Sequence, residues 1–515
     1  MVKGLKGTKL FHNSWICNKG KVGLTIITML SSAQYAYTQE AAKVQFTAAT
    51  TEYNAAVGKD TKRLIGNVIF THNGAKMYCD SAYFYSSKNS LDAFSNIYIN
   101  QGDTVHLYGD FLNYNGNTHV AKVRQNVRLI KNEATLTTDS LEYNISSATG
   151  YYTHHADIVN QENHLESFKG YYYTRSDLFD FRDSVIVINP KYRITSDTLK
   201  YNTKSKTAYF FGPTQIVGDS NYIYCERGWY NTKTDISQLN RHALVKNKRQ
   251  TVKGDSLYYE KLTGFGRGVN NVEIIDSLQN IILKGNLAIY YENSEFARLT
   301  DRAQFIQVSN GDSLFLHADT LLSELDTNGK KIIKAYYGVR IYKSDLQGKC
   351  DSLAYSFADS MLRFYKMPVL WNGDNQLNAD FIDLQLENKQ AKTMHLLGSS
   401  FISSLKDTLK FDQIKGKKMT CHFRNNVIYR IDVNGNGQTV YYPKDKDELI
   451  GANKAECSDL IIYIVNGKVN SIVFLRKPDA TLYPLETAPI NELILKGYKW
   501  YGDLRPFNKE DIFRK

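Results

Sequence analysis

Two stretches of this chain carry residues of the types that bind ions or nucleotides. Residues 432–437 (Asp-Val-Asn-Gly-Asn-Gly) place oxygen ligands at alternate positions, as the start of a calcium loop does. The twelfth position of such a loop is glutamate, but here it is Pro443, so we interpret the stretch as a hairpin turn. The glycine cluster at 264–268 lies between strand-like sequences. A nucleotide loop needs a helix after it, so we expect a turn there instead.

The histidines and aspartates form no catalytic arrangement in the sequence. His154 and His155 are neighbours, and adjacent strand residues point to opposite faces, so we predict no metal pair. The aspartates recur too regularly to be catalytic, and we expect them to make turn or cross-strand hydrogen bonds. No nucleophile stands beside a base. The sequence therefore predicts a protein that is not an enzyme and that holds no cofactor and no metal.

The recurring aspartates belong to a repeated signature. An acidic or polar residue is followed by a small or apolar one, with an aromatic four places on, as in 139–143 (Asp-Ser-Leu-Glu-Tyr) and 255–259 (Asp-Ser-Leu-Tyr-Tyr). Eleven copies, some weaker, begin at positions 80, 110, 139, 169, 197, 226, 255, 286, 319, 351 and 380. Even steps of 28 to 33 residues indicate an internal repeat.

A second signature precedes the first by 10 to 14 residues, and it predicts strands. A turn residue opens a segment with apolar residues at every second position, as in 66–70 (Gly-Asn-Val-Ile-Phe) and 126–129 (Asn-Val-Arg-Leu). Period two is typical of a strand with one buried face. Each unit holds two strands and no helix, and single units cannot bury their apolar faces. The sequence predicts an all-β fold: an elongated open β-jelly roll or β-solenoid of about eleven two-strand repeats.

Composition agrees with this prediction. The chain has 37 tyrosines, which favour pleated surfaces, and 8 prolines, five of them in the last 73 residues. The net charge of +12 favours an anionic partner, but no basic block or recognition motif indicates nucleic acid. Five lysines before the short apolar run at 22–30, with small residues at 31–33, predict a signal peptide over 1–33 and an exported protein.

The cysteines fit the same repeat. Cys79, Cys225 and Cys350 each stand just before the acidic position of a copy, where nearly every other copy has a small residue. We therefore expect them to be reduced packing residues, several units apart and beyond the reach of a disulfide.

At this point the sequence resembles the OstA-like family, which includes the periplasmic lipopolysaccharide-transport protein LptA and the N-terminal domain of LptD. The resemblance rests on the Gly66-Asn67-Val68 opening and the Asp-Ser-Leu-x-Tyr series over roughly 61–405. The arrangement looks most like the large OstA-like proteins of Bacteroidetes. The chain departs from the best-known members, since it is longer than one LptA module and too short to add the outer-membrane barrel of LptD.

The resemblance implies an open β-jelly roll whose apolar interior holds lipopolysaccharide acyl chains. It implies periplasmic localisation, association with the outer membrane, and partners that are lipopolysaccharide or lipid A and other transport proteins joined by end-to-end β-stacking. The expected organisation is a signal peptide (1–33), a linker (34–60), the OstA-like repeat domain (61–405) and a β-rich capping or docking region (406–515).

The alternating strands supply candidate lipid-binding residues for such a trough. These are the apolar members of the first strand of each unit, which share one face: Val68, Phe70, Ile97, Ile99, Val127, Leu129, Val185, Val187, Val272, Ile274, Val339 and Ile341. The same residues would also suit a closed core. Two other classes stay open from sequence: a structural or adhesive β-solenoid without lipid cargo, and a polysaccharide-processing β-helix enzyme.

Overall fold

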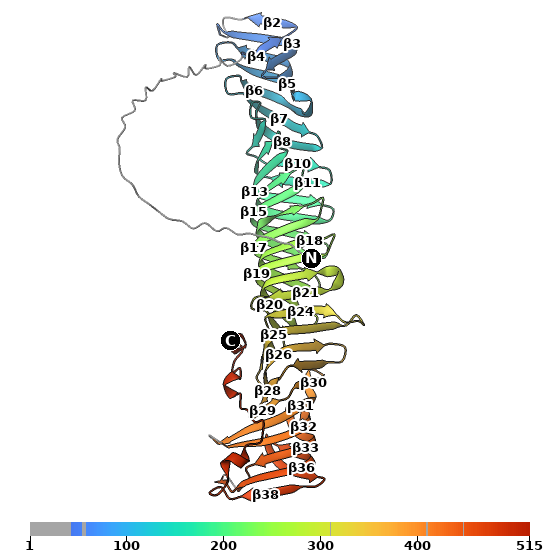
Figure 1. Ribbon diagram of the computed structural model, residues 1–515. Helices are drawn as coiled ribbons and strands as arrows, with labels where there is room; N and C mark the ends of the chain where they lie inside the picture. Colours follow the sequence, from blue (N-terminus) through green and yellow to red (C-terminus); the bar gives the residue numbers. More distant parts are fainter. Residues whose placement is uncertain (1–42, 54–57, 310, 408–409, 446–447, 515) are drawn as a thin grey trace, which may run out of the picture. The chain divides into compact units, whose positions relative to one another are not determined.

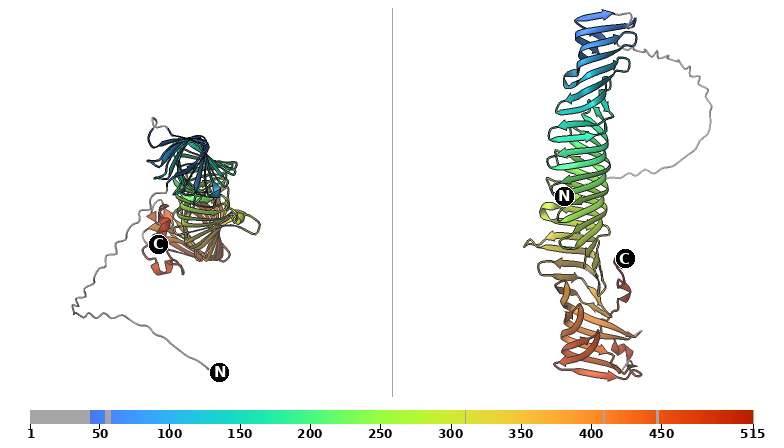
Figure 2. Two further views of the ribbon diagram at one scale, coloured as in Figure 1. Left: turned by 90° about the horizontal axis from the view of Figure 1, so that it is seen from above. Right: turned by 180° about the vertical axis from the view of Figure 1, so that it is seen from behind.

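The computed structural model describes residues 43–53, 58–309, 311–407, 410–445 and 448–514. The expected signal peptide lies outside these residues. Within them the strands follow one another along a column (Figures 1 and 2), and five 3-10 helices of three or four residues are the only described helical elements. They are η1 (Gly102–Thr104), η2 (Glu292–Ser294), η3 (Ile490–Leu493), η4 (Gly502–Leu504) and η5 (Asp511–Phe513).

Thirty-six of the described strands form one sheet, and every pairing in it is antiparallel. Twenty strands of 10 to 18 residues run the full width of the sheet. They are β3 (Thr61–His72), β4 (Ala75–Tyr85), β5 (Ser90–Gln101), β6 (Val105–Asn115), β7 (Val120–Lys131), β8 (Ala134–Asn144), β13 (Leu178–Asn189), β14 (Tyr192–Asn202), β15 (Thr207–Gly218), β16 (Tyr222–Asn231), β17 (Ile236–Lys246), β18 (Gln250–Glu260), β19 (Phe265–Asp276), β20 (Ile281–Tyr291), β25 (Lys331–Lys343), β26 (Leu346–Ser356), β31 (Gln390–Asp407), β32 (Lys410–Arg424), β33 (Val427–Tyr441) and β36 (Ala452–Val465).

The other strands of this sheet are shorter, because each is one half of a strand that is interrupted at its bend. They are β1 (Gln45–Thr47), β2 (Thr50–Tyr53), β9 (Thr149–Tyr152), β10 (Ala156–Asn160), β11 (Asn163–Ser167), β12 (Lys169–Tyr173), β21 (Phe296–Thr300), β22 (Gln304–Gln307), β23 (Leu314–His317), β24 (Thr320–Leu325), β27 (Met361–Tyr365), β28 (Val369–Asn372), β29 (Asn375–Asn378), β30 (Phe381–Glu387), β37 (Lys468–Leu475) and β38 (Asp479–Tyr483). A separate small pair joins β34 (Lys444–Asp445) to β35 (Glu448–Leu449).

A bulge near the middle of each full-width strand bends it. Between β5 and β6 the register shifts from Phe94 to Ile97, and the residues between them are exposed. Leu91 before the bend and Ile97 after it are both buried. The two halves of the strand therefore turn the same face inward, and the stack of bent strands encloses an interior.

The bend of every second strand is built mainly from two successive left-handed residues. In β7 they are Gln125 (φ 62°) and Asn126 (φ 52°). Twelve such pairs lie at bends, at 66–67, 95–96, 125–126, 183–184, 241–242, 270–271, 301–302, 337–338, 366–367, 398–399, 435–436 and 476–477. Glycine and asparagine are frequent there because L-residues with larger side chains pay a steric cost in this conformation.

The aspartate of the repeat holds this bend from the neighbouring strand. Asp110 Oδ2 accepts a hydrogen bond from Asn126 Nδ2 at 2.6 Å, and Asp80 accepts one from Asn96 at 2.7 Å. Asp255 makes the same bond further along the stack. The expectation that the repeated aspartates make cross-strand hydrogen bonds is confirmed at these positions.

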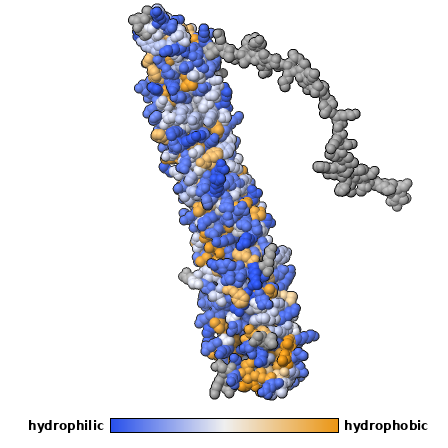
Figure 3. All heavy atoms as spheres, turned by 90° about the vertical axis from the view of Figure 1, so that its left-hand side faces the viewer, coloured by the Kyte–Doolittle hydropathy of each residue, from blue (hydrophilic) through white to orange (hydrophobic). Residues whose placement is uncertain are grey.

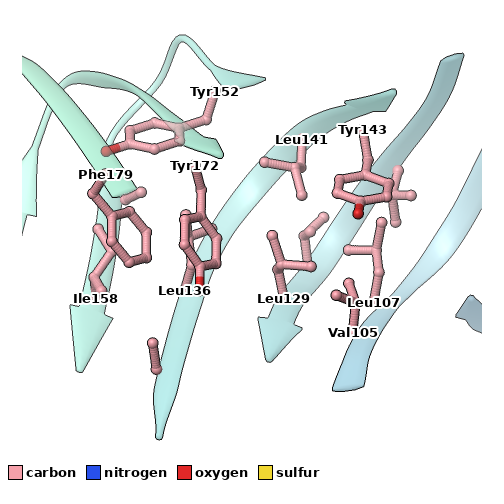
Figure 4. Close-up of a cluster of buried hydrophobic side chains, with 14 of the residues drawn as sticks. Val105, Leu107, Leu129, Leu136, Leu141, Tyr143, Tyr152, Ile158, Tyr172 and Phe179 are labelled. Atoms are coloured by element: carbon pink, nitrogen blue, oxygen red, sulfur yellow. The ribbon is translucent and has the colours of Figure 1, made fainter. Parts of the chain in front are cut away.

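Apolar side chains from both halves of each strand fill the interior in the first part of the stack (Figure 4). Leu129, Leu141 and Tyr143 from β7 and β8 point toward one another, and each is at most 1% exposed. Nearby, Tyr172 stacks on Phe179 with ring centroids 3.8 Å apart. Burial of such large side chains contributes about 1.5–3 kcal/mol each, so these contacts stabilise the stack.

The all-β prediction is confirmed, and the structure also tests several local expectations. Residues 460–465 and 468–475 form the expected hairpin around Asn466-Gly467, with Val465 paired to Lys468. The interpretation of 432–437 as a hairpin turn is wrong, because these residues are the bend inside β33, where Gly435 and Asn436 are the left-handed pair. A parallel β-helix is also excluded for the described residues, whose pairings are all antiparallel.

The ladder extends beyond the limits expected for the repeat. Strands β1 and β2 lie in the segment expected to be a linker and pair with β3. At the other end β31, β32, β33 and β36 continue the pairing past residue 405.

After β38 the chain folds back beside the stack, as the C-terminus in Figure 1 shows. Gln413, buried in β32, donates to the Leu493 carbonyl at 2.8 Å and accepts from the Leu495 amide at 2.9 Å. Gln376 binds the following part of the segment with two bonds of 2.7 Å. These two glutamine side chains bind backbone groups of the C-terminal segment in place of a neighbouring strand, and they fix the segment against the sheet.

Every cysteine among the described residues is buried and free, which confirms the prediction for Cys79, Cys225 and Cys350. Burial raises the pKa of each of these three thiols to about 12. The thiolate is the reactive form. We therefore expect iodoacetamide at pH 8 to leave them unlabelled in the native protein and to label them in guanidinium. Rapid native labelling, detected by peptide mass spectrometry, would contradict the packing.

The left-handed bend predicts that valine and glycine rank in opposite orders of stability at two positions of β7. At Asn126 the φ of 52° should make Asn126→Val less stable than Asn126→Gly, by about 1–2 kcal/mol. At Arg128, an exposed position two residues on, the β-branched Arg128→Val should be more stable than Arg128→Gly. Denaturant unfolding measures both differences. The same order at both positions would show that the left-handed bend is not a constraint.

Candidate functional site

The two ends of each bent strand lie in two rows of turns, and we call the line where the rows approach each other the seam. One row contains the turns after β3, β5, β7 and β10, and the other contains the turns after β6, β8, β12 and β14. Side chains from one row bond to the other row, which closes the interior along one side.

Bonds across the seam recur every 29 or 30 residues in the first part of the stack. His72 Nδ1 contacts the Tyr114 hydroxyl at 2.6 Å, and Tyr143 donates to Gln101 Oε1 at 2.6 Å. The next two sets centre on lysines: Lys131 contacts Asp177 Oδ1 at 2.6 Å and the Thr174 carbonyl, and Lys206 contacts Asn160 Oδ1 at 3.2 Å. The interior is therefore covered from β3 to about β14.

The series then stops. The next positions in the two rows are Asn189 and Lys191 on one side and Thr232 and Asp235 on the other. Within the described ranges no hydrogen bond or ion pair joins these two sides. A bond between the rows returns with Asp276 and Lys331, 3.4 Å apart. We call the part of the seam between these limits the open section.

A cavity of about 510 Å³ lies at the start of the open section. Its lining joins turn residues of both rows to side chains of the interior. Ile216, Ile223 and Leu239 form its apolar part. Tyr192 and Tyr230 also line it and meet edge to face, with ring centroids 6.2 Å apart.

The interior is incompletely filled here because its side chains become smaller. In β5 the inward residues are Leu91, Ala93, Ile97 and Ile99. The corresponding residues are Ser237, Leu239, Ala243 and Val245 in β17, and Gly266, Gly268, Val272 and Ile274 in β19. Serine and alanine in place of leucine and isoleucine fill less of the interior, and Ser237 itself lines the cavity.

A half-buried apolar stripe follows from this change. The fully buried core is divided into one cluster that ends at Leu257 and another that begins at Val272. Partly buried apolar residues lie against the adjoining ends of the two clusters: Tyr192, Ile223, Tyr230, Val245, Val252, Ile274 and Tyr290. Apolar surface that faces an interior without being covered is the usual lining of a ligand site.

The twelve residues predicted to line a trough all belong to the inward-facing set. Eleven of them are at most 6% exposed and belong to the two clusters of buried residues, while Ile274 is partly buried in the open section. Sequence reasoning missed Ile223, Val245 and Val252, because it considered only the clearest first strands of the units. The stretches 222–225 (Tyr-Ile-Tyr-Cys) and 243–245 (Ala-Leu-Val) are apolar or aromatic throughout, so alternation did not mark their inward members.

The charges at the cavity lie at its rim. Lys191 and Lys261 line the opening together with Glu162 and Asp235. Burial raises the pKa of Tyr192 to about 12, so that phenol stays neutral inside the cavity. The pKa of Tyr230 is also raised, first by burial and then by its hydrogen bond to Asp235. The site thus combines a neutral interior with a charged edge.

One family model matches the chain. It is that of the OstA-like proteins, and it covers residues 42–197 and 195–255. Residues 42–255 are OstA-like. The resemblance seen in the sequence is therefore confirmed over the closed first part of the stack and the first half of the open section. No curated protein matches the chain.

The OstA-like family, which matches residues 42–255, is a transport and binding family associated with periplasmic lipopolysaccharide transport. None of the helices among the described residues has the length and apolar character needed to cross a bilayer.

The bonds across the seam predict that two lysines contribute differently to the free energy of unfolding. Lys131 and Asp177 are 11% and 16% exposed, so Lys131→Met leaves a carboxylate nearly buried without its partner. We expect a loss of about 3 kcal/mol in unfolding free energy and faster hydrogen exchange at 174–177. The matched control is Lys122→Met, whose pair with Glu142 is about half exposed, and which should lose under about 1 kcal/mol. Equal losses would contradict a closed seam.

Proposed function

We propose that the protein is a periplasmic carrier of lipopolysaccharide whose acyl chains enter the interior through the open section of the seam. The observation that carries the proposal is the half-buried apolar stripe between the two clusters of buried residues. The family association supports the choice of cargo. The cavity of about 510 Å³ falls in the ~300–1,000 Å³ range that is usual for ligand pockets.

Acyl chains suit this interior on energetic grounds. Each buried CH₂ group contributes about 0.8 kcal/mol, so a few units of the stack retain a lipid outside a membrane. A polar headgroup stays at the seam, because the interior of the open section is lined by aliphatic side chains and neutral tyrosines. Lys191 and Lys261 at the rim are the cations placed to meet lipid A phosphates.

The ends of the sheet suit the proposed stacking on other transport proteins. β37 and β38 form the last edge of the described ladder, and both pair only with β36. Leu482 there is 59% exposed and Val473 is 41% exposed. Figure 3 shows apolar side chains gathering toward this C-terminal end. An exposed strand edge with apolar side chains is the feature that β-strand addition uses.

Photo-crosslinking tests the cargo and its place. A photoreactive residue at Ile223 or Ile274 faces the open section, whereas one at Tyr224 or Glu273 lies on the other face of the same strand. In cells that make lipopolysaccharide, we expect adducts at the first two positions, at least fivefold above the second two. Val127 serves as a third position within the closed core.

Adducts at Ile223 and Ile274 without adducts at Val127 would confine the lipid to the open section. Adducts at all three would extend its path along the closed part of the stack, in agreement with the twelve-residue trough expected from sequence. Equal labelling on the inward and outward faces, or no lipid adduct at any inward position, would contradict the proposed carrier.

A further inference from the structure

Four potential metal ligands gather on the outer face of the hairpin formed by β10 and β11. Asp157 lies directly opposite Glu166 in the register of the two strands. His164 is two residues before Glu166 and therefore shares its face. His155 precedes β10, at the bend of the strand. Strand pairing thus brings His164 and the two carboxylates together, and His155 stands beside Asp157.

The separations of the ligand atoms of Asp157, His164 and Glu166 suit a single metal ion. Asp157 Oδ1 is 3.4 Å from His164 Nε2 and 3.5 Å from His155 Nε2, and Glu166 Oε1 is 3.2 Å from His164 Nε2. The ligand atoms of Asp157, His164 and Glu166 all lie within 4.8 Å of one another. Zinc binds nitrogen and oxygen at about 2.0–2.2 Å, so two ligands of a tetrahedral site are roughly 3.3–3.6 Å apart.

We propose that Asp157, His164 and Glu166 form a binding site for a divalent transition-metal ion, with Zn²⁺ as the best-matched ion. Imidazole and carboxylate are ligands of zinc, and three protein ligands leave the fourth position of a tetrahedral site to water. Two carboxylates directly opposite each other on neighbouring strands destabilise a sheet. A bound divalent cation would neutralise both carboxylates, which accounts for their placement opposite each other.

The backbone around His155 is fixed before any ion binds. The Thr138 hydroxyl lies 2.8 Å from the His155 carbonyl and 3.1 Å from the His154 carbonyl, within hydrogen-bonding distance of both. The side chains of the site are 33% to 41% exposed, so an ion reaches them without rearrangement of the sheet. The His155 ring stands beside the site, with its Nε2 3.5 Å from Asp157 Oδ1.

The position of the site connects it to the cavity. The turn of the same hairpin, residues 161–163, lines the opening of the cavity described above. A metal ion that ties β10 to β11 would therefore hold one side of that opening. The metal site itself depends on neither the lipid nor the carrier function, and it is tested separately.

Isothermal titration of the purified full chain with ZnCl₂ measures the site directly. We expect one Zn²⁺ per chain with micromolar affinity, and a weakening of at least tenfold in His164→Gln and in Glu166→Gln. Both substitutions keep the size of an exposed side chain, and circular dichroism checks that the variants fold. His242→Ala is the control, because among the described residues His242 contacts a single carboxylate, that of Glu226.

Thermal unfolding gives a second readout. Zinc should raise the midpoint of the wild-type chain and of His242→Ala, and it should leave the midpoint of His164→Gln unchanged. Absence of zinc binding to the wild-type chain would overturn the proposal. Binding of unchanged affinity in His164→Gln and Glu166→Gln would overturn it as well, since the ion would then sit elsewhere.

Discussion

The bend in the middle of each strand is the constraint on which the rest of the structure depends. A straight strand with period-two alternation has one apolar face and would stack into an open sheet. The left-handed pair at residues such as 125–126 folds the strand so that both halves turn this face inward, and Asp110 holds the fold from the next strand. Because neighbouring bends align along the ladder, the interior is continuous, and its width is set by the side chains within it.

The interior is closed or open according to two variables that change along the chain. The first is the size of the inward side chains, which falls from leucine and isoleucine in β5 to serine, alanine and glycine in β17 and β19. The second is the row of bonds across the seam, which ends with Asn160 and Lys206 and returns with Asp276 and Lys331. Both changes fall on the same strands, so the opening coincides with the place where space is left inside.

Much of this architecture could be predicted from the sequence because it rests on local patterns. The aspartates at 80, 110 and 255 mark the bends, and the alternation around Val127 and Leu129 fixes which face is buried. Features that depend on pairing between distant residues could not be predicted. Gln413 gives no sign in the sequence that it binds the backbone at Leu493, 80 residues away. Likewise, Asp157 and Glu166 lie opposite each other only because the register of β10 and β11 places them together.

Native mass spectrometry of the chain purified from Gram-negative cells tests the carrier account most directly. The account predicts that the wild-type chain retains a lipid of the mass of lipid A or lipopolysaccharide. It also predicts that Ile223→Glu loses the lipid, since a carboxylate in the open section repels both acyl chains and phosphate groups. Tyr224→Glu, on the other face of the strand, should retain it. A lipid-free wild-type chain, or equal retention by Ile223→Glu, would contradict the account.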